Sequence, residues 1–264
     1  MPSEAHTPFI SFRGVTKAFG DKAVYGGLDL DVFRGETLTI LGPSGCGKSV
    51  MLKMLIGLIG YDAGSIRFDG HEISEMGLAE LSRLRIRIAY LFQSAALFDS
   101  MTVEDNVAYG LRERFWNSMS EDDIRARVAK SLGRVGLAGT EHMMPSDLSG
   151  GMRKRAGLAR TLALEPDVLL YDEPTTGLDP INTARINELI LTIQKELGIT
   201  SIVVTHDMGT AFHVANRMCM LGNGRVHMVG APSDFRTTKD PFVRAFVEGT
   251  VLDERDAAQG LVPH

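Results

Sequence analysis

The sequence has few cysteines, no long hydrophobic run and no excess of positive charge. Its two cysteines, Cys46 and Cys219, lie far apart and form no C-x-x-C pair, as is typical of a reducing compartment. The longest apolar runs, such as "TLTILG" and "DVLLY", are shorter than the roughly 18 residues of a membrane-spanning helix. With 28 Lys and Arg against 33 Asp and Glu, the net charge of −5 favours no nucleic-acid partner. The N-terminus shows no export signal, so we expect a cytosolic protein.

What is present indicates a globular chain. Its 264 residues are 44% hydrophobic and 23% charged, close to the averages of folded domains, which argues against disorder and fibrous structure. The length allows one or two domains with a sizeable core. Residues 249–264 lack a clear period and are expected to form a tail that stays disordered unless a partner holds it.

Strand patterns and helix patterns alternate along most of the chain. The first 35 residues favour antiparallel strands, because Leu28, Leu30 and Val32 alternate with Asp29 and Asp31. Further strands are predicted at "TLTILG", "GSIRFDG", "RIAYLF", "DVLLYDE", "TSIVVTH", "RMCML" and "GRVHMVG". Helices are predicted over most of 103–135 and over 181–197 and 207–215, with capping boxes at Thr102 and Ser120. The alternation predicts an α/β fold with a parallel sheet covered by helices.

The most specific motif is a phosphate-binding loop between a strand and a helix. Residues 42–49, "GPSGCGKS", match G-x-x-x-x-G-K-[ST] in full. Glycines let successive backbone N–H groups point at phosphate oxygens, and the start of the following helix adds its positive dipole end. We expect Lys48 to reach the outer phosphates and the Ser49 hydroxyl to bind Mg²⁺. The alternative is an ordinary glycine turn. The predicted contacts are Gly42, Pro43, Ser44, Gly45, Cys46, Gly47, Lys48 and Ser49.

Polar residues follow three other predicted strands. Asp172 and Glu173 end "VLLYDE", His206 ends "TSIVVTH" and Gln93 follows "RIAYLF". Because the carboxyl ends of parallel strands meet at one edge of a sheet, all four side chains are expected near the nucleotide. Asp172 could hold Mg²⁺ through water, and Glu173 could orient or deprotonate the attacking water. Each residue also has a structural alternative, as an acidic turn, a structural histidine or an exposed loop glutamine.

A second anion site is predicted at "LSGGM". Ser149, Gly150 and Gly151 precede a helical pattern, so a hydroxyl and two unobstructed backbone N–H groups would meet at a helix N-terminus. The alternative is a plain serine N-cap.

In this order, the motifs resemble those of the ATP-binding subunits of ABC transporters. The resemblance covers about residues 8–248 and comprises the Walker A loop, the glutamine loop, the signature "LSGGM", Walker B, the D-loop "TGLD" and the switch histidine. It implies a P-loop NTPase with a RecA-like parallel-sheet core, an N-terminal antiparallel β subdomain and a helical subdomain at about 94–160, within a domain of residues 1–248. It adds Val50 and Asp179 to the nucleotide contacts and suggests that Phe19 stacks on adenine; the alternative for Phe19 is core packing.

The resemblance also implies cofactors and partners. ATP and Mg²⁺ would bind between two cassettes of a head-to-tail homodimer, with Ser149, Gly150 and Gly151 completing the partner's γ-phosphate site. Ser49, Gln93 and Asp172 would serve the metal, and Glu173, His206 and Gln93 the catalysis. Integral-membrane permease subunits would dock near Gln93 and the apolar residues 95–98, which could equally be core. Met152 replaces the glutamine common at the fifth signature position.

The spellings "LFQSAALF", "MPSDLSGGM", "GLDPI" and "FVRAFVEG" are similar to those of MCE or Mla-type phospholipid transporter ATPases of Gram-negative bacteria. That similarity implies a peripheral subunit at the cytoplasmic face of the inner membrane, with a small STAS-domain subunit and a periplasmic MCE lipid-binding protein as partners. The alternatives are the same motor for another cargo, such as an amino acid or a lipoprotein, a soluble ABC ATPase acting on chromosomes or ribosomes, and a nonhydrolytic nucleotide-binding module. The carboxylate of Glu173 argues against the last of these.

Overall fold

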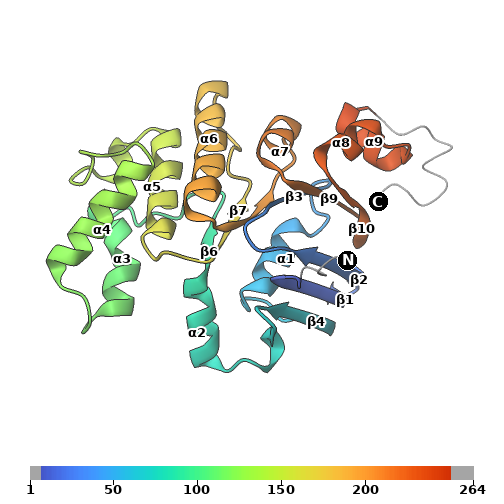
Figure 1. Cartoon of the computed structure of the whole chain (residues 1–264), viewed down its shortest axis with the longest axis horizontal. Helices are drawn as coiled ribbons and strands as arrows, with labels where there is room; N and C mark the ends of the chain where they lie inside the picture. The colour runs from blue at the N-terminus through green and yellow to red at the C-terminus, as the bar shows by residue number, and fades with distance from the viewer. Residues whose placement is uncertain (1–6, 251–264) are drawn as a thin grey trace, which may run out of the picture. The chain divides into compact units, whose positions relative to one another are not determined.

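The structure, a computed structural model, describes residues 7–250 and divides into two compact units (Figure 1). Unit 1 combines residues 1–84 with 200–264, and unit 2 is the continuous segment 85–199. The predicted helical subdomain, 94–160, falls within unit 2, which is longer because it also includes two strands and a long helix. The predicted domain boundaries stay predictions, and the tail beyond residue 250 lies outside the described residues.

Unit 1 contains the antiparallel sheet that the alternating pattern predicts. The strands β1 (Ile10–Phe19), β2 (Lys22–Val32), β4 (Ala63–Phe68) and β5 (His71–Glu72) lie in the order β2-β1-β4-β5, with every neighbouring pair antiparallel. Leu28, Leu30 and Val32 of β2 are buried, whereas Asp29 and Asp31 are not. One face of the sheet therefore packs against the core and the other meets water.

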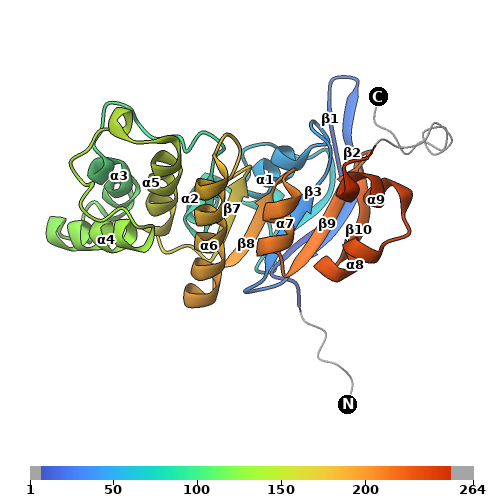
Figure 2. The ribbon, with the colours of Figure 1, turned by 90° about the horizontal axis from the view of Figure 1, so that it is seen from above.

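A second sheet of unit 1 carries the phosphate loop. In it β10 (Arg225–Gly230), β9 (Arg217–Gly222), β3 (Thr37–Leu41) and β8 (Thr200–Val204) lie in that order (Figure 2). β3 runs parallel to β8 and β9, as predicted, but β10 is antiparallel to β9. The difference arises from the two-residue turn at Asn223 and Gly224, whose φ angles of 48° and 71° suit a tight hairpin.

Helices cover this second sheet. α1 (Lys48–Leu55) follows β3, and α7 (Met208–Val214), α8 (Pro232–Thr237) and α9 (Pro241–Glu248) follow later in the chain (Figure 2). Met218 and Met220 of β9 pack with Phe235 of α8 and Phe242 of α9 in one hydrophobic cluster. The helices α8 and α9, like α2 (Leu78–Arg87) and the short 3-10 helix η1 (Ile73–Glu75), were not among the predicted elements.

Unit 2 joins a pair of parallel strands to a group of helices. β6 (Ile88–Leu91) pairs with β7 (Val168–Asp172), and α6 (Pro180–Leu197) follows β7. α3 (Val103–Phe115), α4 (Glu121–Arg134) and α5 (Gly150–Leu162) lie together, with the 3-10 helix η2 (Pro145–Asp147) before α5 (Figure 1). Thr102 caps α3 and Ser120 caps α4. Each hydroxyl accepts a 3.1 Å hydrogen bond from the backbone N–H three residues later, which confirms the two predicted helix starts.

In the part of the chain from residue 7 to residue 250, none of the helices has both the length and the apolar character of a membrane span.

Candidate active site

The phosphate loop joins the buried strand β3 to α1 through a backbone that requires glycine. Gly47 has a φ of 104°, a conformation that residues with a Cβ rarely adopt. At Gly42 a Cβ would lie 2.4 Å from the carbonyl oxygen of Leu221 in β9. The two positions fix the path of the loop between the sheet and the helix. The loop's first half, 43–46, also lines a cavity of about 330 Å³ that residues 22–26 and 223–224 close on the other side.

The side chain of Lys48 folds back onto the loop. Its Nζ donates hydrogen bonds of 2.7 Å to the carbonyl oxygen of Gly42 and 3.1 Å to that of Pro43, and the residue is 7% exposed. The ammonium group therefore lies within the ring of the loop, beside the N-terminal end of α1. A fixed positive charge next to a helix N-terminus is the setting that phosphate groups bind.

Tyr25 supports the loop from beneath, a role that the strand pattern around it does not predict. Its hydroxyl donates a 2.7 Å hydrogen bond to the carbonyl oxygen of Gly47, and the residue is 2% exposed. Burial raises the pKa of Tyr25, so the hydroxyl keeps its proton and remains a donor. In a trans peptide the C=O and N–H groups point in opposite directions, so holding the Gly47 carbonyl down directs the Lys48 N–H toward the open side of the loop.

The cysteine of the loop points inward. A Cβ at Gly42 would lie 2.7 Å from Cys46 Sγ, which places this thiol under the loop. Burial raises the pKa of Cys46, and it raises that of Cys219 to about 12. Both thiols are therefore protonated at neutral pH, and any contact of Cys46 with phosphate would come from its backbone.

His206 and the phosphate loop leave the same edge of the second sheet. Ile40 of β3 is paired with Val204 of β8, and the Thr205 N–H donates to the Ile40 carbonyl over 3.2 Å. The two parallel strands therefore end at the same level of the sheet. His206, two residues beyond the end of β8, is exposed. Within unit 1, His206 therefore lies at the same sheet edge as the phosphate loop, as predicted. Its role in catalysis stays a prediction.

Phe19 is at the end of β1 and is not a core residue. Its side chain is 48% exposed, and the ammonium of Lys17 lies 5.1 Å from the centre of its ring. The structure thus argues against the alternative of core packing. Stacking on adenine stays a prediction.

Unit 2 brings Gln93 and the two acidic residues to one edge. Leu91, the last residue of β6, is paired with Tyr171 of β7, so Gln93, two residues beyond β6, and Asp172, the last residue of β7, lie at neighbouring strand ends. Asp172 is 8% exposed, and its Oδ2 accepts a 2.6 Å hydrogen bond from the hydroxyl of Tyr90. Burial, together with this bond to a carboxylate, raises the pKa of Tyr90, which therefore stays a donor. Tyr90 is a second supporting residue that the strand pattern did not reveal.

Glu173 has an unusual backbone conformation. Its φ is +50°, a left-handed angle that is uncommon outside glycine and is often found at functional sites. The Thr176 hydroxyl donates to Glu173 Oε2 over 3.2 Å. Lys154 of α5 donates to the carbonyl oxygens of Glu173 and Thr176 at 3.3 and 2.8 Å. Burial lowers the pKa of Lys154, and the charge of Glu173 partly offsets this.

The serine and glycines of the signature have different surroundings. Ser149 caps α5, its hydroxyl accepting from the Met152 N–H over 3.3 Å, so the N-cap alternative describes the geometry within this chain. A Cβ at Gly150 would meet nothing nearer than 4.0 Å, whereas one at Gly151 would lie 2.6 Å from Asn182 Oδ1. Gly150 is therefore the more open of the two, and Gly151 is needed for packing against α6. Contact with a partner's phosphate stays a prediction.

Asp179 has a structural role in its own chain. Its Oδ1 accepts from the N–H groups of Ile181 and Asn182 at 2.9 and 3.0 Å, which caps α6. The backbone N–H and the side-chain amide of Asn182 both donate to Asp179, and these two bonds lower the pKa of the Asp179 carboxyl, which therefore stays ionised at neutral pH.

The apolar stretch after Gln93 is only partly core. Ala95 is 5% exposed and packs beneath Gly157, whereas Phe98 is 38% exposed. The ring of Phe98 lies 4.9 Å from that of Tyr109 and 4.6 Å from the guanidinium of Arg160. An aromatic and cationic surface is thus presented beside the glutamine loop, and its docking to a membrane subunit stays a prediction.

The predicted magnesium site differs from an all-protein metal centre. Within residues 7–250, no group of three or more His, Cys, Asp or Glu side chains is arranged to hold a metal ion. The predicted donors are the Ser49 hydroxyl, the Gln93 amide, Asp172 through water, and phosphate oxygens. Mg²⁺ prefers such oxygen donors and keeps several waters. The Asp172 carboxylate, held by Tyr90 through one oxygen, fits this role.

The phosphate loop lies in unit 1, whereas the signature and the two acidic residues at the end of β7 lie in unit 2. That they meet in one pocket stays a prediction. Comparison with protein families shows what the chain is related to. The family model described as ABC transporter matches residues 25–176. The chain belongs to the ABC transporter family. It is an ATP-binding cassette that hydrolyses ATP.

The names of this cassette's relatives refer to different transported substrates. A "probable ribonucleotide transport ATP-binding protein mkl" of Mycobacterium leprae is 44% identical over 91% of this chain and 69% of its own length. The "intermembrane phospholipid transport system ATP-binding protein MlaF" is 39% identical over 91% of this chain, with 88% of the Escherichia coli protein and 90% of the Haemophilus influenzae protein covered.

Solved structures show the same fold. The cassette cbiO1 of Clostridium perfringens, part of the ABC transporter complex cbiONQ, has a TM-score of 0.81 at 30% identity, covering 96% of this chain and 99% of that one. The ATP-binding cassette MJ0796, solved as a dimer bound to ADP and phosphate, has a TM-score of 0.77 at 30% identity, covering 84% and 98%. The predicted P-loop NTPase fold of an ABC ATPase is confirmed.

The support of the phosphate loop by Tyr25 can be tested by removing one hydroxyl. Tyr25→Phe keeps the ring but loses the hydrogen bond to Gly47, worth about 1 kcal/mol. We expect the Kd for ATP to rise about fivefold, with a smaller change in kcat, as measured by nucleotide titration and steady-state hydrolysis. Tyr109→Phe is the control, because Tyr109 lies on α3 in the other unit. Equal ATP affinity in wild type and Tyr25→Phe would show that the ring alone supports the loop.

Proposed function

We propose that this cassette is the ATP-hydrolysing motor of a phospholipid transport system, bound peripherally at the cytoplasmic face of the inner membrane. The observation that carries the proposal is the similarity, over nine-tenths of the chain, to proteins named for intermembrane phospholipid transport. The loop spellings around the glutamine loop and the signature agree with it. Ribonucleotide transport is a second candidate, because the mycobacterial relatives that carry this name are up to 44% identical.

In the proposed reaction, Lys48 and the N–H groups of the loop hold the outer phosphates of ATP. Glu173 orients the attacking water and accepts its proton, while His206 and Gln93 contact the γ-phosphate end of the site. Magnesium, held by Ser49 and, through water, by Gln93 and Asp172, would neutralise phosphate charge. The local support described above fits two of these roles, since Tyr25 holds the loop next to Lys48 and Thr176 donates to the carboxylate of Glu173.

The proposed assembly is a head-to-tail homodimer with composite sites. Ser149 and the open Gly150 of one copy would face the nucleotide bound by the other copy's loop. The neighbouring cassette MJ0796 was solved as a dimer, which supports this arrangement. The dimer would act on integral-membrane permease subunits near Gln93 and residues 95–98. A small STAS-domain subunit and a periplasmic MCE lipid-binding protein complete the proposed system, and ATP and Mg²⁺ are its cofactors.

Removal of the proposed general base should separate ATP binding from hydrolysis. In Glu173→Gln the amide cannot accept the proton of the attacking water, so we expect ATP affinity within about twofold of wild type and turnover reduced by about 10²-fold or more. Nucleotide titration and phosphate release measure the two effects. Glu196→Gln, at an exposed position near the end of α6, is the matched control. Turnover that Glu173→Gln leaves unchanged would remove this residue from the reaction.

The composite site makes a specific prediction for mixed dimers. Lys48→Ala destroys the loop half of a site and Ser149→Arg the signature half, so each homodimer should be inactive. A heterodimer of the two variants would keep one intact site, and we expect mixing to restore part of the ATPase activity. The measurement is phosphate release against mixing ratio. An inactive mixture, with heterodimers verified by tagged co-purification, contradicts the head-to-tail arrangement.

The cargo is tested with the complete complex. We expect the cassette, purified in mild detergent with its native membrane subunits and reconstituted in proteoliposomes, to drive ATP-dependent transfer of a fluorescent phospholipid to or from its periplasmic lipid-binding partner. Glu173→Gln in the same complex controls for passive exchange. ATP-dependent movement of a radiolabelled ribonucleotide, with no lipid transfer, would support the second candidate and overturn the first.

A further inference from the structure

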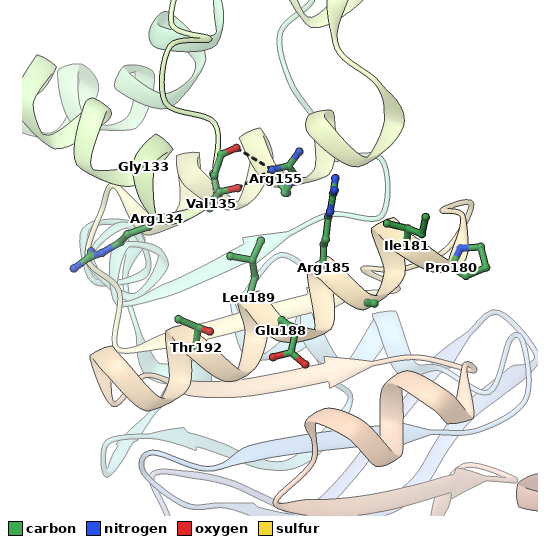
Figure 3. A pocket seen from close by; sticks show the side chains of 12 residues that line it. Gly133, Arg134, Val135, Arg155, Pro180, Ile181, Arg185, Glu188, Leu189 and Thr192 are labelled. Carbon is green, nitrogen blue, oxygen red and sulfur yellow. Dashed lines mark hydrogen bonds between the residues drawn. The ribbon is translucent and has the colours of Figure 1, made fainter.

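Unit 2 contains an open groove that none of the predicted nucleotide contacts line. It has a volume of about 740 Å³ and lies between the C-terminal end of α4, α5 and α6 (Figure 3). Its apolar lining includes Val135 after α4 and Ile181 and Leu189 on α6, and Arg155 and Arg185 face each other across it. The ATPase mechanism gives this surface no task.

The groove follows one face of α6. Ile181, Arg185, Leu189 and Thr192 are three or four residues apart and therefore share a face of the helix. From Ile181 to Thr192 this face is about 17 Å long, or three helical turns. Ile181 is 68% exposed, which is unusual for a large aliphatic side chain next to other apolar groups.

The positive charge of the groove is fixed in place. Arg155 Nη1 donates hydrogen bonds of 3.0 Å to the carbonyl oxygens of both Val135 and Gly136, while its buried Nε has no partner among the described residues (Figure 3). Burial, and in second place the charge of Arg185, lowers the pKa of Arg155. Glu188 also lines the groove, but its carboxylate points away from Arg155 (Figure 3).

The arginines of this groove differ from others in unit 2. Arg87 pairs with Asp167, Arg112 with Asp105 and Glu121, and Arg127 with Glu165. By contrast, Arg134, Arg155 and Arg185 form no ion pair with any acidic side chain in the described part of the chain. In a chain with a net charge of −5, such a concentration of uncompensated positive charge favours an acidic occupant.

We propose that the groove is a docking site for an acidic amphipathic helix of a partner protein. Its apolar residues would cover Ile181, Leu189 and Val135, and its carboxylates would pair with Arg155 and Arg185. The three-turn length of the groove fits a helix. A small anion bound to the arginines would leave the apolar residues of the groove exposed to water. The proposal does not depend on the cargo or on any partner proposed above.

A defined helix provides the first test. We would titrate the full-length chain with a fluorescein-labelled peptide of about 14 residues that carries Leu along one face and Glu elsewhere. Arg185→Glu is expected to weaken binding at least tenfold, and Leu189→Asp similarly. Arg244→Glu, at an exposed position of α9 in unit 1, is the charge-matched control, and unchanged ATPase activity verifies folding. Equal affinity in wild type, Arg185→Glu and Arg244→Glu overturns the proposal, as does equal binding of a peptide with Lys in place of Glu.

The second test uses the complex with its native subunits. A photo-crosslinking amino acid in place of Thr192 should attach to an acidic, amphipathic segment of another polypeptide, and Arg185→Glu should reduce that crosslink at least tenfold. A crosslink to a basic segment, or one insensitive to Arg185→Glu, contradicts the proposal. So does a shift from dimer to monomer on Arg185→Glu in sedimentation of the isolated cassette, because the groove would then belong to a second copy of this chain.

Discussion

The orientation of one peptide group, between Gly47 and Lys48, is the constraint on which the phosphate loop depends. The carbonyl of Gly47 accepts hydrogen bonds from Tyr25 and from the N–H of Met51, so it is held on the side of the helix and the strand below. The opposite side of the peptide is then available to an anion. Only glycine fits, because a Cβ at this position would lie 2.7 Å from Val24 and 2.8 Å from the Tyr25 hydroxyl. The antiparallel sheet thus supports the loop through β2.

The acidic strand end of unit 2 follows a similar principle. Asp172 and Glu173 are consecutive, yet their side chains are held by different groups, Tyr90 for the first and Thr176 for the second. The backbone at Glu173 is left-handed, and its carboxylate accepts from a different donor than that of Asp172. One strand end can thus provide one carboxylate for the metal ion and another for the attacking water, as the family resemblance implies.

Much of this arrangement could be predicted from the sequence because it depends on local patterns. The spacing of the loop glycines, the caps at Thr102 and Ser120 and the alternation in β2 are all local, and the structure reproduces them. Tyr25, Tyr90 and Lys154 could not be found in this way. Each makes contacts 15 or more residues away in sequence, and a tyrosine within a strand pattern looks the same whether its hydroxyl supports a loop or not. The antiparallel direction of β10 was missed because a two-residue hairpin was not recognised at Asn223 and Gly224.

Lys154 has a consequence for how the cassette responds to closure. The residue is buried, at 8% exposure, and its ammonium donates hydrogen bonds to main-chain oxygens at both ends of a four-residue turn. Separating Lys154 from these oxygens would leave a buried charge without its hydrogen bonds, which is costly, so α5 and the turn at 173–176 are held together. Ser149 caps the same helix, so a displacement of the start of α5 would be passed to the main chain of Glu173 through the Lys154 side chain. Binding of a second copy at Ser149, as proposed above, would then also affect the position of Glu173, the proposed base.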